Sequence, residues 1–159
     1  MKNRTITVKT SSITVVSRHE QDFEETFAYL TKLRRENHVL RPSAFGDFNE
    51  ATTDHDMIKW FNADGEIMTE QNWHDGECRT IQRYSEHLDG SGNRSAMLLL
   101  IHGAEKVIEV TLPSQDDVVG FDLIWNSAFD VPGETSERFA PGAKTSVSGT
   151  SIQLFRCNI

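Results

Sequence analysis

The residues best suited to chemistry lie in one short stretch, WFNADGEIMTEQNW, at residues 60–73. Trp60 and Trp73 stand at its two ends, and Asp64 and Glu66 flank a glycine between them. Planar aromatic rings can stack on the apolar faces of sugars, and a pair of carboxylates can hydrolyse a glycosidic bond. The stretch is therefore either a carbohydrate site or a scaffold segment in which the tryptophans bury apolar area.

Turn formation explains the two carboxylates better than catalysis does. Glycoside hydrolysis needs two carboxyl groups about 5–9.5 Å apart, one of them with a raised pKa. Asp64-Gly65 is a typical tight-turn sequence, and a turn tip stays in water, which removes the desolvation that raises a carboxyl pKa. A hydrolase with its own carboxylate pair is therefore the least favoured of three functional hypotheses.

The other reactive side chains form no recognisable centre. A structural zinc site needs four nitrogen or sulfur ligands at short spacing, whereas His74 and Cys78 are one pair without a second. Asp54-His55-Asp56 lacks the glycine and the distal glutamate of a calcium-binding loop. The sequence contains neither a nucleophile elbow nor a phosphate-binding loop. We therefore predict no metal, no cofactor and no catalytic residue.

The three tryptophans support a second hypothesis, a freestanding module that binds α-glucans such as glycogen or maltodextrin. Such a module needs at least two rings exposed on one face. The competing interpretation, which we favour, is that the rings anchor the core and its connections. The candidate glucan-binding residues are Trp60, Trp73 and Trp125.

The composition narrows the range of partners. The 159 residues include 16 basic and 24 acidic side chains, for a formal net charge of −8. This charge repels phosphate backbones and anionic lipid headgroups, so we expect no nucleic acid and no membrane as a partner. Cys78 and Cys157 are too few for a disulfide scaffold, and no apolar run reaches 18 residues. These features predict a cytoplasmic protein with one domain, or one domain and an appendage.

The first 42 residues predict a strand segment followed by a helix. Residues 5–16, TITVKTSSITVV, are rich in β-branched side chains and favour one or two short strands. Ser17 and Glu20 then have the spacing of a helix capping box. Apolar residues at intervals of four, three and three predict an amphipathic helix that runs to about Asn37. They are Phe23, Phe27, Leu30 and Leu33.

Residues 43–159 predict short strands separated by turns. Thr69 is placed to cap one helical turn, and residues 130–142 read as a long loop. The run AMLLLI is apolar enough for a buried central strand, and TSVSG with TSIQLFRC predicts a terminal hairpin. The strands are expected at 57–62, 79–88, 96–101, 108–112 and 121–126.

The fold class is therefore mainly β, an antiparallel β-sandwich preceded by one amphipathic helix. The expected division is 1–42 for the strand segment and helix, and 43–159 for the sandwich. Because an apolar stripe is rarely left in water, we expect the helix to pack on its own sandwich or on a second copy of the chain.

Three runs of the sequence resemble the C-terminal end of bacterial glycogen debranching enzymes of the isoamylase type. The opening stretch is similar to that family's signature W-[FL]-x-P-D-G-x-E-M-T-x-x-D-W, with Ala63 in the place of proline, Glu66 directly after the glycine and Asn72 in the place of aspartate. The three runs are LTKLRRENHVLRPSAF, DHDMIKWFNADGEIMTEQNWHDGECRTIQRYSEHLDG and AMLLLIHGAEKVIEVTLP.

This resemblance implies a fold and a limit on function. The family joins a catalytic (β/α)8 barrel of glycoside hydrolase family 13 to a C-terminal β-sandwich, so the sandwich is expected to be of the α-amylase C-terminal-domain type. The helix is similar to the last helix of the barrel. The family's catalytic residues lie upstream of every matched segment, which implies a noncatalytic accessory domain in glycogen breakdown, able to contact a barrel through Phe23, Phe27, Leu30 and Leu33.

Overall fold

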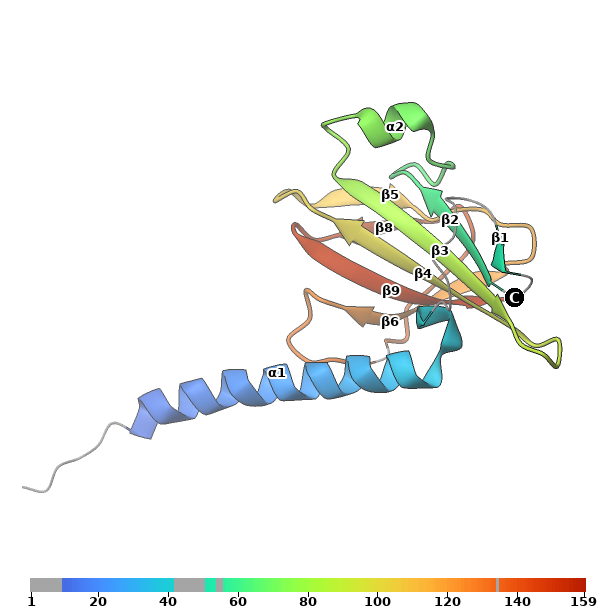
Figure 1. The fold of residues 1–159 in the computed structure, drawn as a ribbon. Coiled ribbons are helices and arrows are strands. Elements are labelled where there is room, and N and C mark those ends of the chain that lie inside the picture. The colour runs from blue at the N-terminus through green and yellow to red at the C-terminus, as the bar shows by residue number, and fades with distance from the viewer. Residues whose placement is uncertain (1–9, 42–50, 54–55, 134) are drawn as a thin grey trace, which may run out of the picture.

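The computed structural model describes residues 10–41, 51–53, 56–133 and 135–159. The protein is mainly β, with antiparallel sheets and one sizeable helix (Figure 1). In chain order its elements are α1 (Thr10–Glu36), the 3-10 turn η1 (His38–Leu40), β1 (Ala51–Thr53), β2 (Asp56–Phe61), α2 (Glu70–His74), β3 (Thr80–Leu88), β4 (Arg94–His102), β5 (Ile108–Thr111), β6 (Gly120–Asn126), β7 (Arg138–Phe139), β8 (Lys144–Val147) and β9 (Ser151–Asn158).

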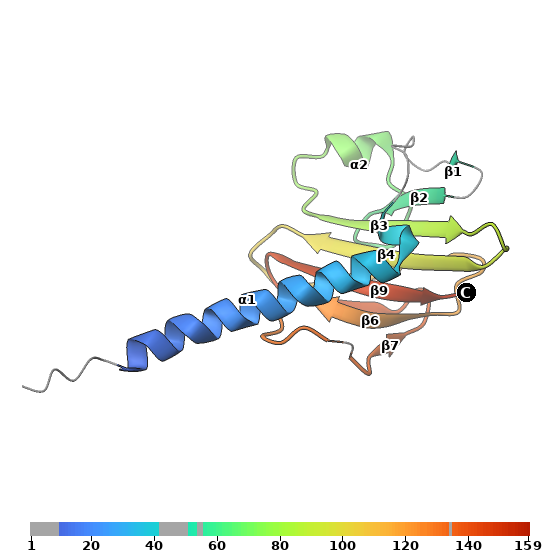
Figure 2. The ribbon, with the colours of Figure 1, turned by 60° about the horizontal axis from the view of Figure 1, so that its bottom comes forward.

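The strands form two sheets of unequal size. The larger sheet has seven strands in the order β1-β2-β3-β4-β9-β6-β7, and β5 pairs with β8 in a separate two-stranded sheet. The C-terminal part of α1 lies across the larger sheet, while its N-terminal part extends beyond the sandwich (Figures 1 and 2).

The first apolar cluster lies between the two sheets. Strand periodicity sends alternate side chains of β4 and β9 to this side, so Leu98, Leu100 and Phe155 become fully buried. Val110 of β5 and Val147 of β8 close the cluster from the smaller sheet, and each is 0% exposed. This cluster is the core of the sandwich.

The second cluster lies on the opposite face of the larger sheet. Met97, Ile124 and Leu154 form the sheet side of this cluster, and Leu33 of α1 with Val39 of η1 covers them. The hydroxyl of Tyr29 donates a hydrogen bond of 2.7 Å to the carbonyl oxygen of Ile124. The helix is therefore attached to the sheet by its last two turns.

The prediction of strand at residues 5–16 is wrong for residues 10–16, which belong to α1; residues 5–9 lie outside the described part of the chain. The capping box expected at Ser17 is wrong too, because the helix already begins at Thr10. A strand needs a neighbouring strand for its backbone hydrogen bonds, whereas a helix satisfies its own. The β-branched residues lower helix propensity by only about 0.5 kcal/mol each.

Most of the other local predictions are confirmed. The helix ends at Glu36, and the expected strands correspond to β2, β3, β4, β5 and β6. The run AMLLLI forms the middle of β4, the central strand of the larger sheet. The expected loop at 130–142 additionally contributes β7, a short edge strand paired with β6.

The predicted terminal hairpin is wrong. β8 pairs with β5 in the smaller sheet, whereas β9 lies between β4 and β6 in the larger one. Both strands alternate in the expected way, but pairing is decided by backbone hydrogen bonds with strands distant in the chain, which alternation does not reveal. The link between them crosses from one sheet to the other.

Candidate functional site

The stretch at residues 60–73 forms a turn organised by the side chain of Asn62. Its Oδ1 atom accepts hydrogen bonds from the backbone N–H groups of Asp64 (2.9 Å) and Glu66 (3.0 Å). Gly65 has a φ of +79°, and a Cβ there would lie 3.0 Å from the carbonyl oxygen of Thr111 on β5. Glycine therefore meets two demands at once, the left-handed backbone and the close approach to the smaller sheet.

A capped helical turn follows, as the sequence predicts. The Thr69 hydroxyl accepts a hydrogen bond from the backbone N–H of Asn72 (3.2 Å), and the Asn72 side chain accepts one from the backbone N–H of Thr69 (3.0 Å). This reciprocal pair satisfies two free donors at the start of α2. It fixes the position of Trp73, one residue further on.

Trp60 and Trp73 meet at the outer face of the larger sheet. Their ring centroids are 5.6 Å apart and the ring planes are inclined by 77°. Trp73 is 42% exposed, whereas Trp60 is half-buried. Part of the Trp73 ring is therefore accessible to solvent where it meets Trp60.

Trp125 lies on the same face but far from this pair. The strand register sets Trp60, Arg83, Leu99, Leu154 and Trp125 in one cross-strand row. Four strand spacings separate its ends, which is about 19 Å. A bulge between Leu123 and Trp125 turns the Trp125 ring to the helix side, where it packs against the second cluster. The structure therefore brings together two of the three candidate glucan-binding tryptophans.

Arg83 is a candidate binding residue that the sequence analysis missed. It lies directly across from Trp60 on the adjacent strand, so the two side chains share one face. Burial lowers the pKa of Arg83, and within the described residues its guanidinium forms no hydrogen bond or ion pair. Its five N–H donors could bind the hydroxyl groups of a sugar stacked on the tryptophans. The sequence could have identified Arg83 through strand alternation, which sets it on the same face of β3 as Ile81 and Ser85.

The two carboxylates of the turn do not face each other across a cavity. Asp64 and Glu66 are both exposed, and only Asp64 borders the adjoining open pocket of ≈ 450 Å³. In the same pocket His102 is held by the Thr80 hydroxyl (2.7 Å) and the Lys106 carbonyl oxygen (2.8 Å). Because both ring nitrogens of His102 have partners, this histidine is a structural residue.

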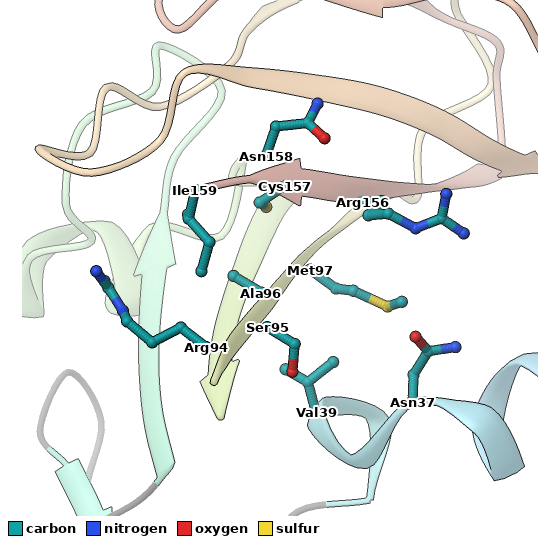
Figure 3. A pocket seen from close by; sticks show the side chains of 10 residues that line it. All are labelled: Asn37, Val39, Arg94, Ser95, Ala96, Met97, Arg156, Cys157, Asn158 and Ile159. Atoms are coloured by element: carbon teal, nitrogen blue, oxygen red, sulfur yellow. The ribbon is translucent and has the colours of Figure 1, made fainter. Parts of the chain in front are cut away.

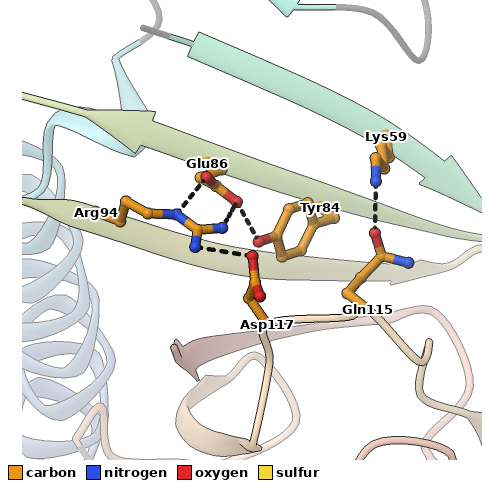
Figure 4. Close-up of polar contacts among 6 residues, drawn as sticks. All are labelled: Lys59, Tyr84, Glu86, Arg94, Gln115 and Asp117. Carbon is orange, nitrogen blue, oxygen red and sulfur yellow. Dashed lines mark hydrogen bonds and ion pairs between the residues drawn. The ribbon is translucent and has the colours of Figure 1, made fainter. Parts of the chain in front are cut away.

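Two sets of polar contacts connect the segment before β6 to the larger sheet, one through β3 and β4 and one through β2 (Figure 4). Arg94 donates to both carboxylate oxygens of Glu86 (2.8 and 3.1 Å) and to Asp117 (2.9 Å). The Tyr84 hydroxyl donates to Glu86 at 2.7 Å, and Lys59 donates to Gln115 at 2.8 Å.

Burial opposes the ionisation of Glu86, but hydrogen bonds from Arg94 and Tyr84 outweigh it and lower the pKa of Glu86. Burial, with the hydrogen bond to Glu86, raises the pKa of Tyr84. The network therefore favours one protonation state, with Glu86 ionised and Tyr84 neutral. We interpret it as a clamp that holds residues 114–118 to the larger sheet.

A second pocket, of ≈ 280 Å³, lies where the end of α1 meets β4 and β9 (Figure 3). Asn37 and Val39 line its helix side, and Met97 and Cys157 line its sheet side. Burial is the main cause that raises the pKa of the Cys157 thiol, and the negative charge of Glu86 adds to it. This sulfur therefore stays protonated. The pocket thus holds a thiol of low nucleophilicity at the base of the helix.

The described histidines do not gather into a metal centre. His87 Nδ1 lies 2.6 Å from Asp56 Oδ1, and the ring of His38 stacks on His87 at 5.4 Å. Among the residues placed by the structure, no group of three or more histidine, cysteine, aspartate or glutamate side chains could hold a metal ion. Among the same residues, no helix combines the length and the apolar character needed to span a bilayer.

Comparison with known proteins identifies no family for this chain. Neither a protein-family model nor a curated protein matches the chain.

Proposed function

We propose that the chain is a noncatalytic accessory domain that resembles the C-terminal part of bacterial glycogen debranching enzymes. In this role its sandwich is of the α-amylase C-terminal-domain type, and α1 corresponds to the last helix of a catalytic barrel. The domain then stabilises the barrel that degrades glycogen or limit dextrin. The catalytic residues belong to the barrel and not to this chain.

One observation carries the proposal: the apolar stripe of α1 is covered at its C-terminal end and exposed nearer its N-terminal end. Leu33 is only 6% exposed, because it packs on the larger sheet. Phe23 and Phe27 are 71% and 65% exposed on the same helix. A helix shared by a barrel and a sandwich needs apolar surface for each, and the exposed part of this stripe would supply the surface for the barrel.

The test mixes the purified chain with an isoamylase-type debranching enzyme truncated after its barrel. We expect the two proteins to associate, and the barrel's half-life at elevated temperature to increase, because binding to the native state stabilises it. Replacement of Phe23 and Phe27 by serine should abolish both effects. Val119→Ser is the matched control, since Val119 is 77% exposed but lies outside α1.

Two outcomes would count against the accessory role. One is the absence of association at about 100 μM of each protein, a concentration at which even weak interfaces form. The other is association that persists unchanged after both phenylalanines are replaced.

A second candidate function, binding of an α-glucan, is favoured by the partial exposure of Trp73. This ring rests on Trp60 and lies on the same face as the guanidinium of Arg83. An exposed aromatic face beside an array of N–H donors suits a pyranose ring, which is apolar on its faces and polar at its rim.

Titration with maltoheptaose, followed by tryptophan fluorescence and by calorimetry, tests this candidate. We expect a millimolar affinity that Trp73→Ala and Arg83→Met each weaken at least tenfold. Trp125→Phe should leave the affinity unchanged, because Trp125 packs with the second cluster. If saturating millimolar sugar changes neither signal, the chain does not bind glucan at this site.

A further inference from the structure

Arg83 is a cation without a counter-ion in the part of the chain that the structure describes. It lies half-buried on the outer face of β3, and its guanidinium makes no hydrogen bond and no ion pair with a described residue. Burial is the sole cause that shifts its pKa, and it lowers the pKa because no described acceptor offsets it. Five N–H donors are therefore available to a ligand.

The side chains around Arg83 remove water from it without neutralising it. The strand register sets Trp60 of β2 on one side of it and Leu99 of β4 on the other. Ile81 and Ser85 precede and follow it on the same face of β3. None of these four side chains carries a charge. A partly desolvated cation in such surroundings is stabilised when a ligand supplies the missing anion.

Trp60 connects this cation with the partly exposed ring of Trp73. The ring centroids of the two tryptophans are 5.6 Å apart. Trp60 also lies directly opposite Arg83 in the pairing of β2 with β3, a position at which Cβ atoms are about 5 Å apart. A sugar that contacts the rings therefore has its polar rim within reach of the guanidinium.

A phosphate monoester is the substituent that suits this position. Its oxygens accept hydrogen bonds from the guanidinium in pairs, and its charge of about −1.5 to −2 at pH 7 neutralises the cation. A sugar hydroxyl would satisfy the donors but leave the charge. The net charge of −8 does not prevent binding, because charges more than about 8 Å away are largely screened at physiological salt.

We infer that the outer face of β2 and β3 binds an α-glucan that carries phosphate monoester groups, with the sugar on Trp73 and Trp60 and the phosphate on the guanidinium of Arg83. This inference rests on the glucan-binding candidate function and names the class of glucan. It does not depend on the accessory role.

Calorimetric titration of the full chain with maltoheptaose, and with maltoheptaose phosphorylated at its primary hydroxyl groups, tests the inference. We expect the phosphorylated sugar to bind at least tenfold more tightly at low salt, because its contact with Arg83 is charge-assisted. This advantage should shrink when salt is added, since salt screens charges near the surface. Inorganic phosphate should bind more weakly than the phosphorylated sugar, because it lacks the contact with the rings.

Substitutions of Arg83 separate its charge from its packing. Arg83→Met should reduce the ratio of the two affinities to about one, because the charge is lost while the apolar stem is kept. Arg83→Lys should keep part of the ratio, since the charge remains without the fork. Arg138→Met is the matched control and should keep the full ratio. Arg138 lies on β7, at the opposite end of the larger sheet, and already pairs with Asp122 at 2.6 Å.

The urea midpoint of Arg83→Met provides a second measurement. It should equal or exceed that of the wild type, because the substitution removes a partly desolvated charge that has no described partner. A lower midpoint would show that Arg83 holds the fold together and would overturn the inference.

The binding outcomes distinguish this inference from the glucan-binding candidate. If both sugars bind equally, the phosphate contact is wrong and glucan binding stands, whereas if neither sugar binds, both are wrong. An advantage of the phosphorylated sugar that persists in Arg83→Met would overturn the inference. Inorganic phosphate that binds as tightly as the phosphorylated sugar would overturn it too, because the rings would then contribute nothing.

Discussion

At the scale of residues, Arg94 and Glu86 form a bidentate pair in which the carboxylate is largely buried. The Glu86 side chain is only 12% exposed, whereas that of Arg94 is 37% exposed. A carboxylate removed from water depends on its partners, because its desolvation is not otherwise compensated. The exposed end of Arg94 continues to Asp117, so one guanidinium connects two strands with a loop.

Arg94→Met should therefore lower the free energy of unfolding by about 2 kcal/mol at pH 7, since it leaves Glu86 buried without its cation. The native pKa of Glu86 lies below its usual value, so the pair stabilises the protein above about pH 4.5 and loses this effect as the pH falls through the native pKa. The difference between wild type and variant should thus shrink from pH 7 to pH 3. Urea titrations at both pH values measure it.

Lys144→Met is the matched control for this prediction. Lys144 pairs with Glu109 at 2.6 Å, but both side chains are 62% exposed. Exposed pairs contribute little to stability, so the unfolding midpoint of this variant should not change. If Arg94→Met and Lys144→Met changed the unfolding midpoint equally, the buried carboxylate of Glu86 would not depend on Arg94 for its stabilisation.

At the scale of elements, the link between β8 and β9 is the most constrained connection. It carries the chain from the smaller sheet to the larger one within three residues, Ser148, Gly149 and Thr150. Thr150 has a positive φ of 49°, and its N–H donates to the carbonyl oxygen of Ala104 at 2.8 Å. The crossing is therefore held against the loop between β4 and β5.

Gly149→Ala should destabilise the protein by about 3 kcal/mol or more, because overpacking against backbone forces the chain apart. A Cβ at this position would lie 1.9 Å from the carbonyl oxygen of Glu105. Gly90→Ala is the control, since a Cβ there meets nothing within 4 Å, and its effect should stay within about 0.5 kcal/mol. Similar urea midpoints for the two variants would contradict the close approach at Gly149.

At the scale of the whole molecule, one sheet separates two apolar clusters and couples them. Met97 and Leu98 are neighbours on β4, yet one belongs to the helix-side cluster and the other to the core of the sandwich. Loss of packing on either face therefore weakens the same strands. The end of α1 should unfold together with the sheets.

Leu33→Ala should accordingly lower the stability of the entire fold by about 2–4 kcal/mol. Far-UV circular dichroism and tryptophan fluorescence should report one shared transition, displaced to lower urea. Thr31→Ala, on an exposed position of the same helix, should leave both signals unchanged. A helix signal that is lost before the fluorescence changes would show that α1 folds independently of the sheet.

The sequence alone predicted the features that depend on neighbouring residues. The end of α1, the turn at Asn62-Gly65 and the cap at Thr69 each arise from side chains within a few positions of one another. The strands were found by alternation, and the apolar run of β4 indicated its central place. The candidate site was predicted in part, because Trp60 and Trp73 are joined by this local segment.

Only the tertiary structure decided which strands pair and which side chains share a face. The terminal segments alternate like a hairpin, but the two sheets separate β8 from β9. A bulge in β6 sends Trp125 to the helix side, and the register of β2 with β3 sets Arg83 beside Trp60. Pairing and register depend on contacts between residues distant in the chain, which local preferences do not determine. The apolar stripe of α1, by contrast, follows from the sequence, and the structure added that Phe23 and Phe27 remain exposed.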